Sequence, residues 1–254
     1  NLRTVCYFLG WATTQTTNAQ YVAFLNAVDP TGVNPRSIYS GSMSSSVVGG
    51  IQFTGTAANG SKYSVKPGAP AGAPVGTSYG SMPVNFVSWF SAARFVNWLQ
   101  NGQVSGTAAM ETGAYTLNGA VNGTIPARNA GAQFFLPSVN EWYKAAFYRP
   151  AGGYNLYQTG TSGVPTATIS NLSLANAANY ANAATFPINV GSYTNSASAY
   201  GLYDMLGNVA EMTDNTGSAA GASFRAFGGG WGGSAASWNA VATPISQLGT
   251  STNQ

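Results

Sequence analysis

Charged side chains are scarce along the whole chain, and this scarcity limits how its surface can be built. Only 6% of the 254 residues are Asp, Glu, Lys or Arg, whereas about 25% is usual for soluble domains. The polar surface therefore has to consist mainly of Asn, Ser, Thr, Gln and Gly. Such a surface provides little electrostatic repulsion between copies of the same molecule.

The few charges are spread along the chain. Nine basic and six acidic residues give a net charge of +3, and the basic residues form no cluster. This distribution argues against a nucleic-acid-binding surface. No run of 18 or more apolar residues occurs, so we expect no transmembrane segment. A chain of this length can bury a sizeable core, and we expect a single domain over residues 1–254.

One cysteine and no histidine exclude several classes of active site. Cys6 has no partner for an intramolecular disulfide. We interpret Cys6 as a small buried residue rather than a reactive thiol. The absence of histidine excludes Ser-His-Asp and Cys-His catalysis, together with histidine-ligated zinc or iron sites.

Acidic residues come close together in one stretch, residues 201–214 (GLYDMLGNVAEMTD). Asp204 and Glu211 can supply carboxylate oxygens and Gly207 and Val209 can supply carbonyl oxygens, a donor set that suits a hard cation. The same residues also fit a buried turn, in which Gly207 and its neighbour Asn208 allow a left-handed bend. On these residues alone the turn is favoured, because the oxygen pattern is a loose one.

The same stretch resembles the signature of the formylglycine-generating enzyme (sulfatase-modifying factor) domain family. Four further stretches agree with that family in the right order: residues 17–21 (TNAQY), 82–99, 135–146 and 224–231 (FRAFGGGW). The resemblance covers most of the chain. It implies an α+β fold, a variant of the C-type lectin fold with much irregular structure.

The resemblance also changes the interpretation of the acidic stretch. Asp204, Gly207, Val209 and Glu211 match the positions of calcium ligands in the family, which implies that they hold calcium here. A further calcium site of the family would fall at Asn179 and its neighbour Tyr180. The acidic partner expected downstream of them is missing, so we do not expect that further site.

The chemistry of the family's enzymes does not carry over to this sequence. Catalytic members oxidise a substrate cysteine to formylglycine with copper(I), which is held by two cysteine thiolates that follow the glycine-rich segment. Here residues 231–254 contain no cysteine. Relatives in ergothioneine synthesis use a histidine-ligated iron, and this chain has no histidine. We therefore expect no catalytic residues and no copper.

Capping signals and hydrophobic periodicity predict three helices. The first spans residues 18–28 with Thr16 or Thr17 as its cap, the second spans 88–99 with Ser88 as its cap, and the third spans 141–148 after a capping box of Ser138 and Glu141. Alternating patterns predict strands at residues 4–10, 50–54, 62–65, 114–117, 188–193 and 223–227, with the second and third of these forming a hairpin.

Three long stretches of low charge, residues 34–81, 102–131 and 160–184, exceed ordinary loops in length and indicate a functional role. We call them the three excursions. The family's short closing strand is not found at residues 250–254. One interpretation is an unpaired sheet edge with which a second chain can pair; the alternative is that the closing residues exist but are not in this sequence.

Together these features predict a non-catalytic structural protein, secreted or on the cell surface, that assembles with copies of itself into a filament or layer. The composition resembles that of secreted bacterial proteins which carry this domain. Two alternatives stay open. One is a lectin-like module that binds a ligand or glycan, and the other is a formylglycine-generating-type oxidase with an altered site.

Overall fold

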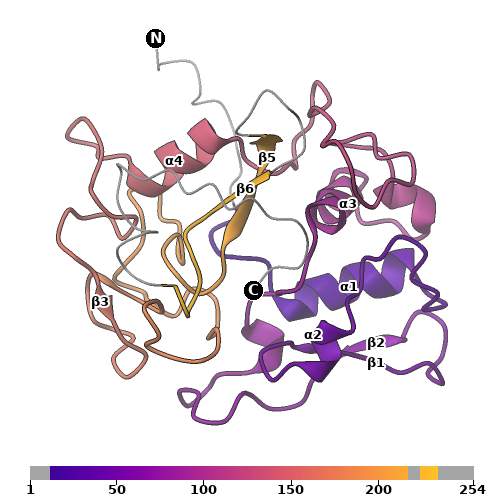
Figure 1. The fold of residues 1–254 in the computed structure, drawn as a ribbon, viewed down its shortest axis with the longest axis horizontal. Helices are drawn as coiled ribbons and strands as arrows, with labels where there is room; N and C mark the ends of the chain where they lie inside the picture. Colours follow the sequence, from indigo (N-terminus) through magenta and orange to yellow (C-terminus); the bar gives the residue numbers. More distant parts are fainter. Residues whose placement is uncertain (1–11, 217–223, 234–254) are drawn as a thin grey trace.

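The computed structural model describes residues 12–216 and 224–233 (Figure 1). Helices and short strands are mixed, and long irregular segments connect them. One half of the molecule contains α1 (Asn18–Val28), α2 (Ser42–Ser45), β1 (Ile51–Phe53), β2 (Tyr63–Val65) and α3 (Trp89–Gln100). The other half contains α4 (Val139–Phe147), β3 (Thr166–Ala167) and β4 (Ala177–Ala178). Between the halves lie β5 (Glu211–Thr216) and β6 (Phe224–Phe227).

All three predicted helices are confirmed, and each begins at its predicted cap. Thr17 accepts a hydrogen bond from the backbone of Gln20 at the start of α1, and Ser88 caps α3. Ser138 and Glu141 form the predicted capping box of α4. The last helix begins at Val139, two residues before the predicted start, because the capping serine immediately precedes it. None of the helices in the described part of the chain combines the length and hydrophobicity that crossing a membrane requires.

The core of the first half is aromatic. The rings of Tyr21 and Phe24 on α1 pack against Phe95 of α3, and the Phe24 and Phe95 centroids are 5.5 Å apart in an edge-to-face arrangement. Trp98 lies one turn further along α3 and also contacts Phe24. Such contacts add to the stabilisation from burial. The helical spacing of these residues predicted this buried face.

Arg94, a buried basic residue in this half, is paired with an acidic one. Arg94 is fully buried on α3 and donates from Nε to Glu111 Oε1 at 2.9 Å, while Arg36 donates to the same oxygen at 3.1 Å. The backbone N–H of Gly119 donates to Glu111 Oε2 at 2.6 Å. Burial raises the pKa of the Glu111 carboxyl, but hydrogen bonds from Arg94 and Gly119 outweigh it and hold that pKa below its usual value.

The strands form three separate pairs. The predicted hairpin is confirmed as antiparallel β1 and β2, with Phe53 opposite Tyr63. The predicted strand near the glycine-rich segment is confirmed as β6, which pairs antiparallel with β5 and sets Phe227 opposite Glu211. A third pair, β3 and β4, is parallel and only two residues long. The strand predicted at residues 4–10 and the closing edge expected at residues 250–254 lie outside the described residues.

Two predicted strands are wrong. Residues 114–117 and 188–193 form turns and extended coil without a strand partner. In the first segment, the side chain of Asn97 accepts from the N–H of Tyr115 and donates to its carbonyl. In the second, Asn208 makes the same pair of bonds with Ile188. An asparagine amide therefore satisfies the backbone groups that a neighbouring strand would otherwise satisfy.

Candidate cation site

The loop of residues 204–211 leads directly into β5 and packs tightly against the glycine-rich segment after β6. Gly207 has a left-handed backbone (φ 78°), and an added Cβ would lie only 2.2 Å from the carbonyl oxygen of Asn179. Asn208 is left-handed as well (φ 61°). The N–H of Gly207 donates to the carbonyl of Gly228 at 2.8 Å. The left-handed bend expected at Gly207 and Asn208 is therefore present.

All four predicted ligands converge on one atom, Nε2 of Gln15. This nitrogen donates to the carbonyl oxygens of Asp204 at 3.2 Å and Val209 at 2.6 Å, and it makes a long contact of 3.5 Å with that of Gly207. It also donates to Oε1 of Glu211. The loop thus gathers three carbonyls and one carboxylate around a single point.

Asp204 differs from the expectation in one respect, because its main-chain carbonyl faces this point. One carboxylate oxygen, Oδ2, instead accepts from the N–H of Gly191 at 2.6 Å. The other, Oδ1, is buried without a hydrogen-bond partner, as are Oε2 of Glu211 and Oε1 of Gln15. The site therefore has more acceptor oxygens than donors, since an amide nitrogen carries only two hydrogens.

The two carboxyl groups also lack a compensating charge. Burial raises the pKa of Glu211 well above its usual value; the charge of Asp204 adds to the rise, whereas Gln15 and Trp142 oppose it. Trp142 Nε1 has no hydrogen bond of normal geometry, so its effect is weak. Burial raises the pKa of Asp204 to about 6, against a hydrogen bond from Gly191. Among the described residues, neither carboxylate forms an ion pair with Lys or Arg.

A donor set of this kind fits a hard cation. Within residues 12–216 and 224–233, no group of three or more His, Cys, Asp or Glu side chains could hold a metal ion. A cation at this loop would therefore depend on carbonyl oxygens. Carbonyl and carboxylate oxygens suit calcium, whereas zinc and copper(I) favour nitrogen or sulfur ligands.

Gln15 is a member of the site that the sequence did not predict. Its partners lie 189 to 196 residues further along the chain, so no local pattern connects them. Its backbone position is set by its neighbours, because Thr13 accepts a hydrogen bond from Tyr203 and Thr16 accepts one from Val84.

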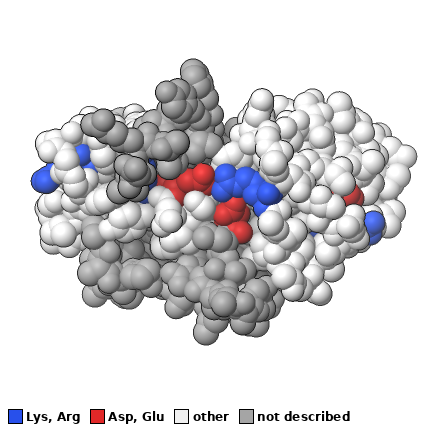
Figure 2. Space-filling model, turned by 90° about the horizontal axis from the view of Figure 1, so that it is seen from above, with Lys and Arg blue, Asp and Glu red and all other residues white. Residues whose placement is uncertain are grey.

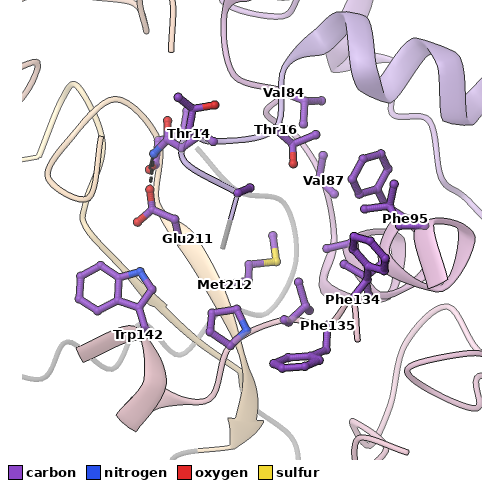
Figure 3. A pocket seen from close by; sticks show the side chains of 18 of the residues that line it. Thr14, Thr16, Val84, Val87, Phe95, Phe134, Phe135, Trp142, Glu211 and Met212 are labelled. Carbon is purple, nitrogen blue, oxygen red and sulfur yellow. Dashed lines mark hydrogen bonds between the residues drawn. The ribbon is translucent and has the colours of Figure 1, made fainter. Parts of the chain in front are cut away.

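A cavity of about 310 Å³ adjoins the site. Glu211 lies at one end of it, where the dashed line in Figure 3 marks its bond to Gln15, and Phe95 and Phe134 lie at the other end. Most of the lining is apolar, with further contributions from Phe135, Leu136, Trp142 and Met212. The sequence did not predict this cavity, because its lining comes from segments distant in the chain.

The remaining acidic residues near β5 are engaged in ion pairs. Arg128 Nη2 lies 2.6 Å from Asp214 and 2.8 Å from Glu141, and its guanidinium stacks on the ring of Phe135 at 3.7 Å. Glu141 also serves the capping box of α4, as predicted. This pairing indicates a structural role for both carboxylates. Figure 2 shows adjacent basic and acidic side chains near the centre of one face, with a few further charged side chains toward its two ends.

Residues 8–247 match the sulfatase-modifying factor enzyme 1-like domain. The chain belongs to this family. Among solved structures, this family member is similar to Treponema denticola variable protein 1, with 22% identity over 66% of this chain and 67% of that chain and a TM-score of 0.45. It is also similar to CarF, with 23% identity over 91% and 79% of the two chains and a TM-score of 0.43. No curated protein matches.

The number of cysteines bears on whether this family member can carry out the oxidation of the formylglycine-generating enzymes. The chain has a single cysteine, Cys6, so it lacks the cysteine pair that holds copper in the family's formylglycine-generating enzymes. Two thiolates cannot be supplied by one side chain. Family membership alone therefore does not assign that oxidation to this protein.

Proposed function

We propose that this chain is a non-catalytic family member, secreted or displayed on the cell surface, that assembles with copies of itself. One observation carries the proposal. Most of the large apolar side chains that are exposed in the described residues lie on the three excursions: Val47, Phe53 and Val75 on the first, Val104 and Val121 on the second, and Val164 and Leu174 on the third.

The surroundings of these side chains favour contact between molecules. Lys, Arg, Asp and Glu together make up only 6% of the chain, so repulsion between like molecules is weak. The free energy falls when a second molecule covers apolar groups on such a surface, because those groups are removed from water. We further propose that the fold is a variant of the C-type lectin fold, in which the excursions, rather than catalytic groups, carry the function.

Assembly is tested by placing a charge on two excursions. Val75→Asp and Val164→Asp should lower the mass of the particles measured by light scattering and shorten any filaments seen by electron microscopy. Leu156→Asp is the matched control, because Leu156 is 52% exposed but lies outside the excursions. A wild-type protein that stays monomeric at high concentration would overturn the proposal.

The adjoining cavity favours a second candidate function, the binding of a ligand. Its volume of about 310 Å³ lies at the lower end of the range for small-molecule sites. The apolar lining favours an apolar or aromatic ligand over a glycan. Val87 lines this cavity, so Val87→Phe should abolish binding of an apolar fluorophore. Val104→Phe, at an exposed position, should not change it. Equal binding by both variants would exclude the cavity as the site.

We also propose that calcium is the cation held by Asp204, Gly207, Val209 and Glu211. It would supply positive charge to the buried carboxylates. A ligand that binds only the folded state stabilises that state by mass action. A chelator should therefore lower the melting temperature of the wild type but not that of Glu211→Gln. If the wild type has the same melting temperature with chelator and with calcium, the loop is a structural turn and the calcium site is refuted.

A further inference from the structure

We propose that Asn122, on the second excursion, is a site of spontaneous deamidation, which adds a negative charge to a surface that carries few charges. Four asparagines of the chain are followed directly by glycine: Asn59, Asn101, Asn118 and Asn122. Asparagine deamidates fastest before glycine, because glycine has no side chain to obstruct attack by its own main-chain nitrogen. The dipeptide alone does not rank the four positions, whereas the surrounding structure does.

The reaction needs no reactant other than water. The main-chain nitrogen of the glycine attacks Cγ of the asparagine, and the new C–N bond closes a succinimide ring. The bond from Cγ to Nδ2 breaks, and ammonia leaves with the proton that the glycine nitrogen has lost. Water then opens the ring at either of its carbonyl groups and leaves aspartate or isoaspartate. A hydrogen bond that holds the glycine N–H or the asparagine amide in place therefore slows the reaction.

A charged partner restrains the pair at Asn118. The N–H of the following residue, Gly119, donates to Oε2 of Glu111 at 2.6 Å, and bonds to a carboxylate are stronger than bonds between neutral groups. Removing a proton beside this negative charge is unfavourable. Hydrogen bonds from Arg94 and Gly119 hold the pKa of the carboxyl below its usual value, so Glu111 is also a weak base. Asn118 therefore deamidates slowly.

Bonds between neutral groups restrain the pairs at Asn101 and Asn59. Nδ2 of Asn101 donates to two main-chain carbonyls of the second excursion, at 2.8 Å and 2.7 Å. Its Cγ cannot turn toward the next nitrogen without breaking both bonds. At the other pair, the N–H of Gly60 donates to the carbonyl of Pro30 at 2.8 Å. Because one bond restrains less than two, we expect Asn59 to react faster than Asn101.

No such restraint acts on Asn122 from the described residues. Neither its side chain nor the N–H of Gly123 forms a hydrogen bond with them, and residues 121–124 are all exposed. A Cβ added to Gly123 would meet none of their atoms within 4 Å, so the loop has room for the rotation that the attack requires. The structure therefore ranks Asn122 as the fastest of the four.

The new charge lies beside an exposed apolar side chain. Val121 directly precedes Asn122 and is 39% exposed, and it is one of the excursion residues to which we assign the contacts between molecules. A carboxylate at this position adds repulsion between copies and is unfavourable to cover with a second molecule. This consequence rests on the proposed function: deamidation gradually lowers the tendency of the protein to assemble.

The first test measures the four rates on the dilute full chain at mildly alkaline pH, by digestion and mass spectrometry of the asparagine-containing peptides over time. Asn122 should react at least about tenfold faster than Asn118 and Asn101, a ratio equivalent to about 1.4 kcal/mol, which is close to the strength of one hydrogen bond. In urea, which unfolds the chain and removes these bonds, the four rates should converge. An unchanged Asn122, or equal rates in the folded chain, would refute the modification site.

The second test concerns assembly. Asn122→Asp carries the charge from the start and should lower the particle mass measured by light scattering. Asn122→Gln is the matched control, because glutamine keeps the amide but its longer side chain closes a ring far more slowly. This variant should assemble like the wild type and, unlike the wild type, should keep its particle mass during storage.

The outcomes separate the modification from the proposed function. If the wild type stays monomeric, assembly is refuted, while the four rates still decide whether Asn122 is the modification site. If the wild type assembles and Asn122→Asp forms particles of the same mass, the effect of the charge on assembly is refuted and the modification site stands. Loss of particle mass by Asn122→Gln during storage at the wild-type rate would also refute that effect.

Discussion

Replacing Asn97 by alanine should be among the most damaging single changes outside the cation site. This side chain is fully buried on α3. Its Nδ2 donates to the carbonyls of Met110 at 3.0 Å and Tyr115 at 2.9 Å, and its Oδ1 accepts from the N–H of Tyr115 at 2.8 Å. Asn97→Ala leaves three backbone groups without a partner in the interior.

The expected cost follows from those three groups. Each buried polar group left unpaired costs about 1–3 kcal/mol, so three such groups should cost at least about 3 kcal/mol, which is large for a single substitution. Asn101 is the matched control, because it lies one helical turn further along and donates to Ala109 at 2.8 Å and Thr112 at 2.7 Å. Asn101 is exposed. Water can replace its bonds, so Asn101→Ala should cost about 1 kcal/mol.

Equilibrium unfolding in urea measures both variants. The midpoint should fall much further for Asn97→Ala than for Asn101→Ala, with similar slopes for the two transitions. Asn97→Asp should be at least as harmful, because it removes the amide donors and buries a charge. If the two alanine variants differ by less than about 1 kcal/mol, the buried amide does not hold the segment around Tyr115 in the way described.

Three further outcomes are expected. The lowered pKa of Glu111 contributes stability that is present above its unfolded value of 4.5 and is lost as the pH falls through the folded value; Glu111→Gln should flatten this acid-dependent loss in urea unfolding. Gly207→Ala should lower the melting temperature far more than Gly201→Ala, because both glycines are left-handed but only Gly207 meets a neighbour. With copper and a cysteine-containing sulfatase peptide, mass spectrometry should detect no aldehyde, and turnover that survives Cys6→Ser would contradict the non-catalytic assignment.

The sequence predicted the elements that depend on local signals. The caps Thr17, Ser88 and Ser138 each precede an apolar pattern of helical period, so the start of each helix could be predicted to within two residues. The hairpin of β1 and β2 was predictable from the alternation of its two segments around a turn at residues 57–60. Gly207 and Asn208 themselves predicted the left-handed bend. The resemblance to the family supplied the expectation that oxygens of the same loop act together.

The two wrong strands have a common cause that a local pattern cannot show. In each of the two segments an asparagine side chain pairs with both backbone groups of one residue: Asn97 with Tyr115, and Asn208 with Ile188. Such a pair satisfies an extended segment without a neighbouring strand. The backbone of an alternating segment can therefore be satisfied by a neighbouring strand or by an asparagine side chain. Only the tertiary structure determines which of the two it meets.

The same reasoning explains why Gln15 could not be predicted although the loop that it contacts could. The oxygens of the loop follow from residues 204–211, a contiguous segment with its own bend. Gln15 reaches them only because Thr13 and Thr16 are bonded to Tyr203 and Val84, two residues far from each other in the sequence. In a chain with so few charges, uncharged amides make contacts that charged residues often make elsewhere. An amide can present either a donor or an acceptor to the same partners. That property makes Gln15 suitable for holding the loop by hydrogen bonds.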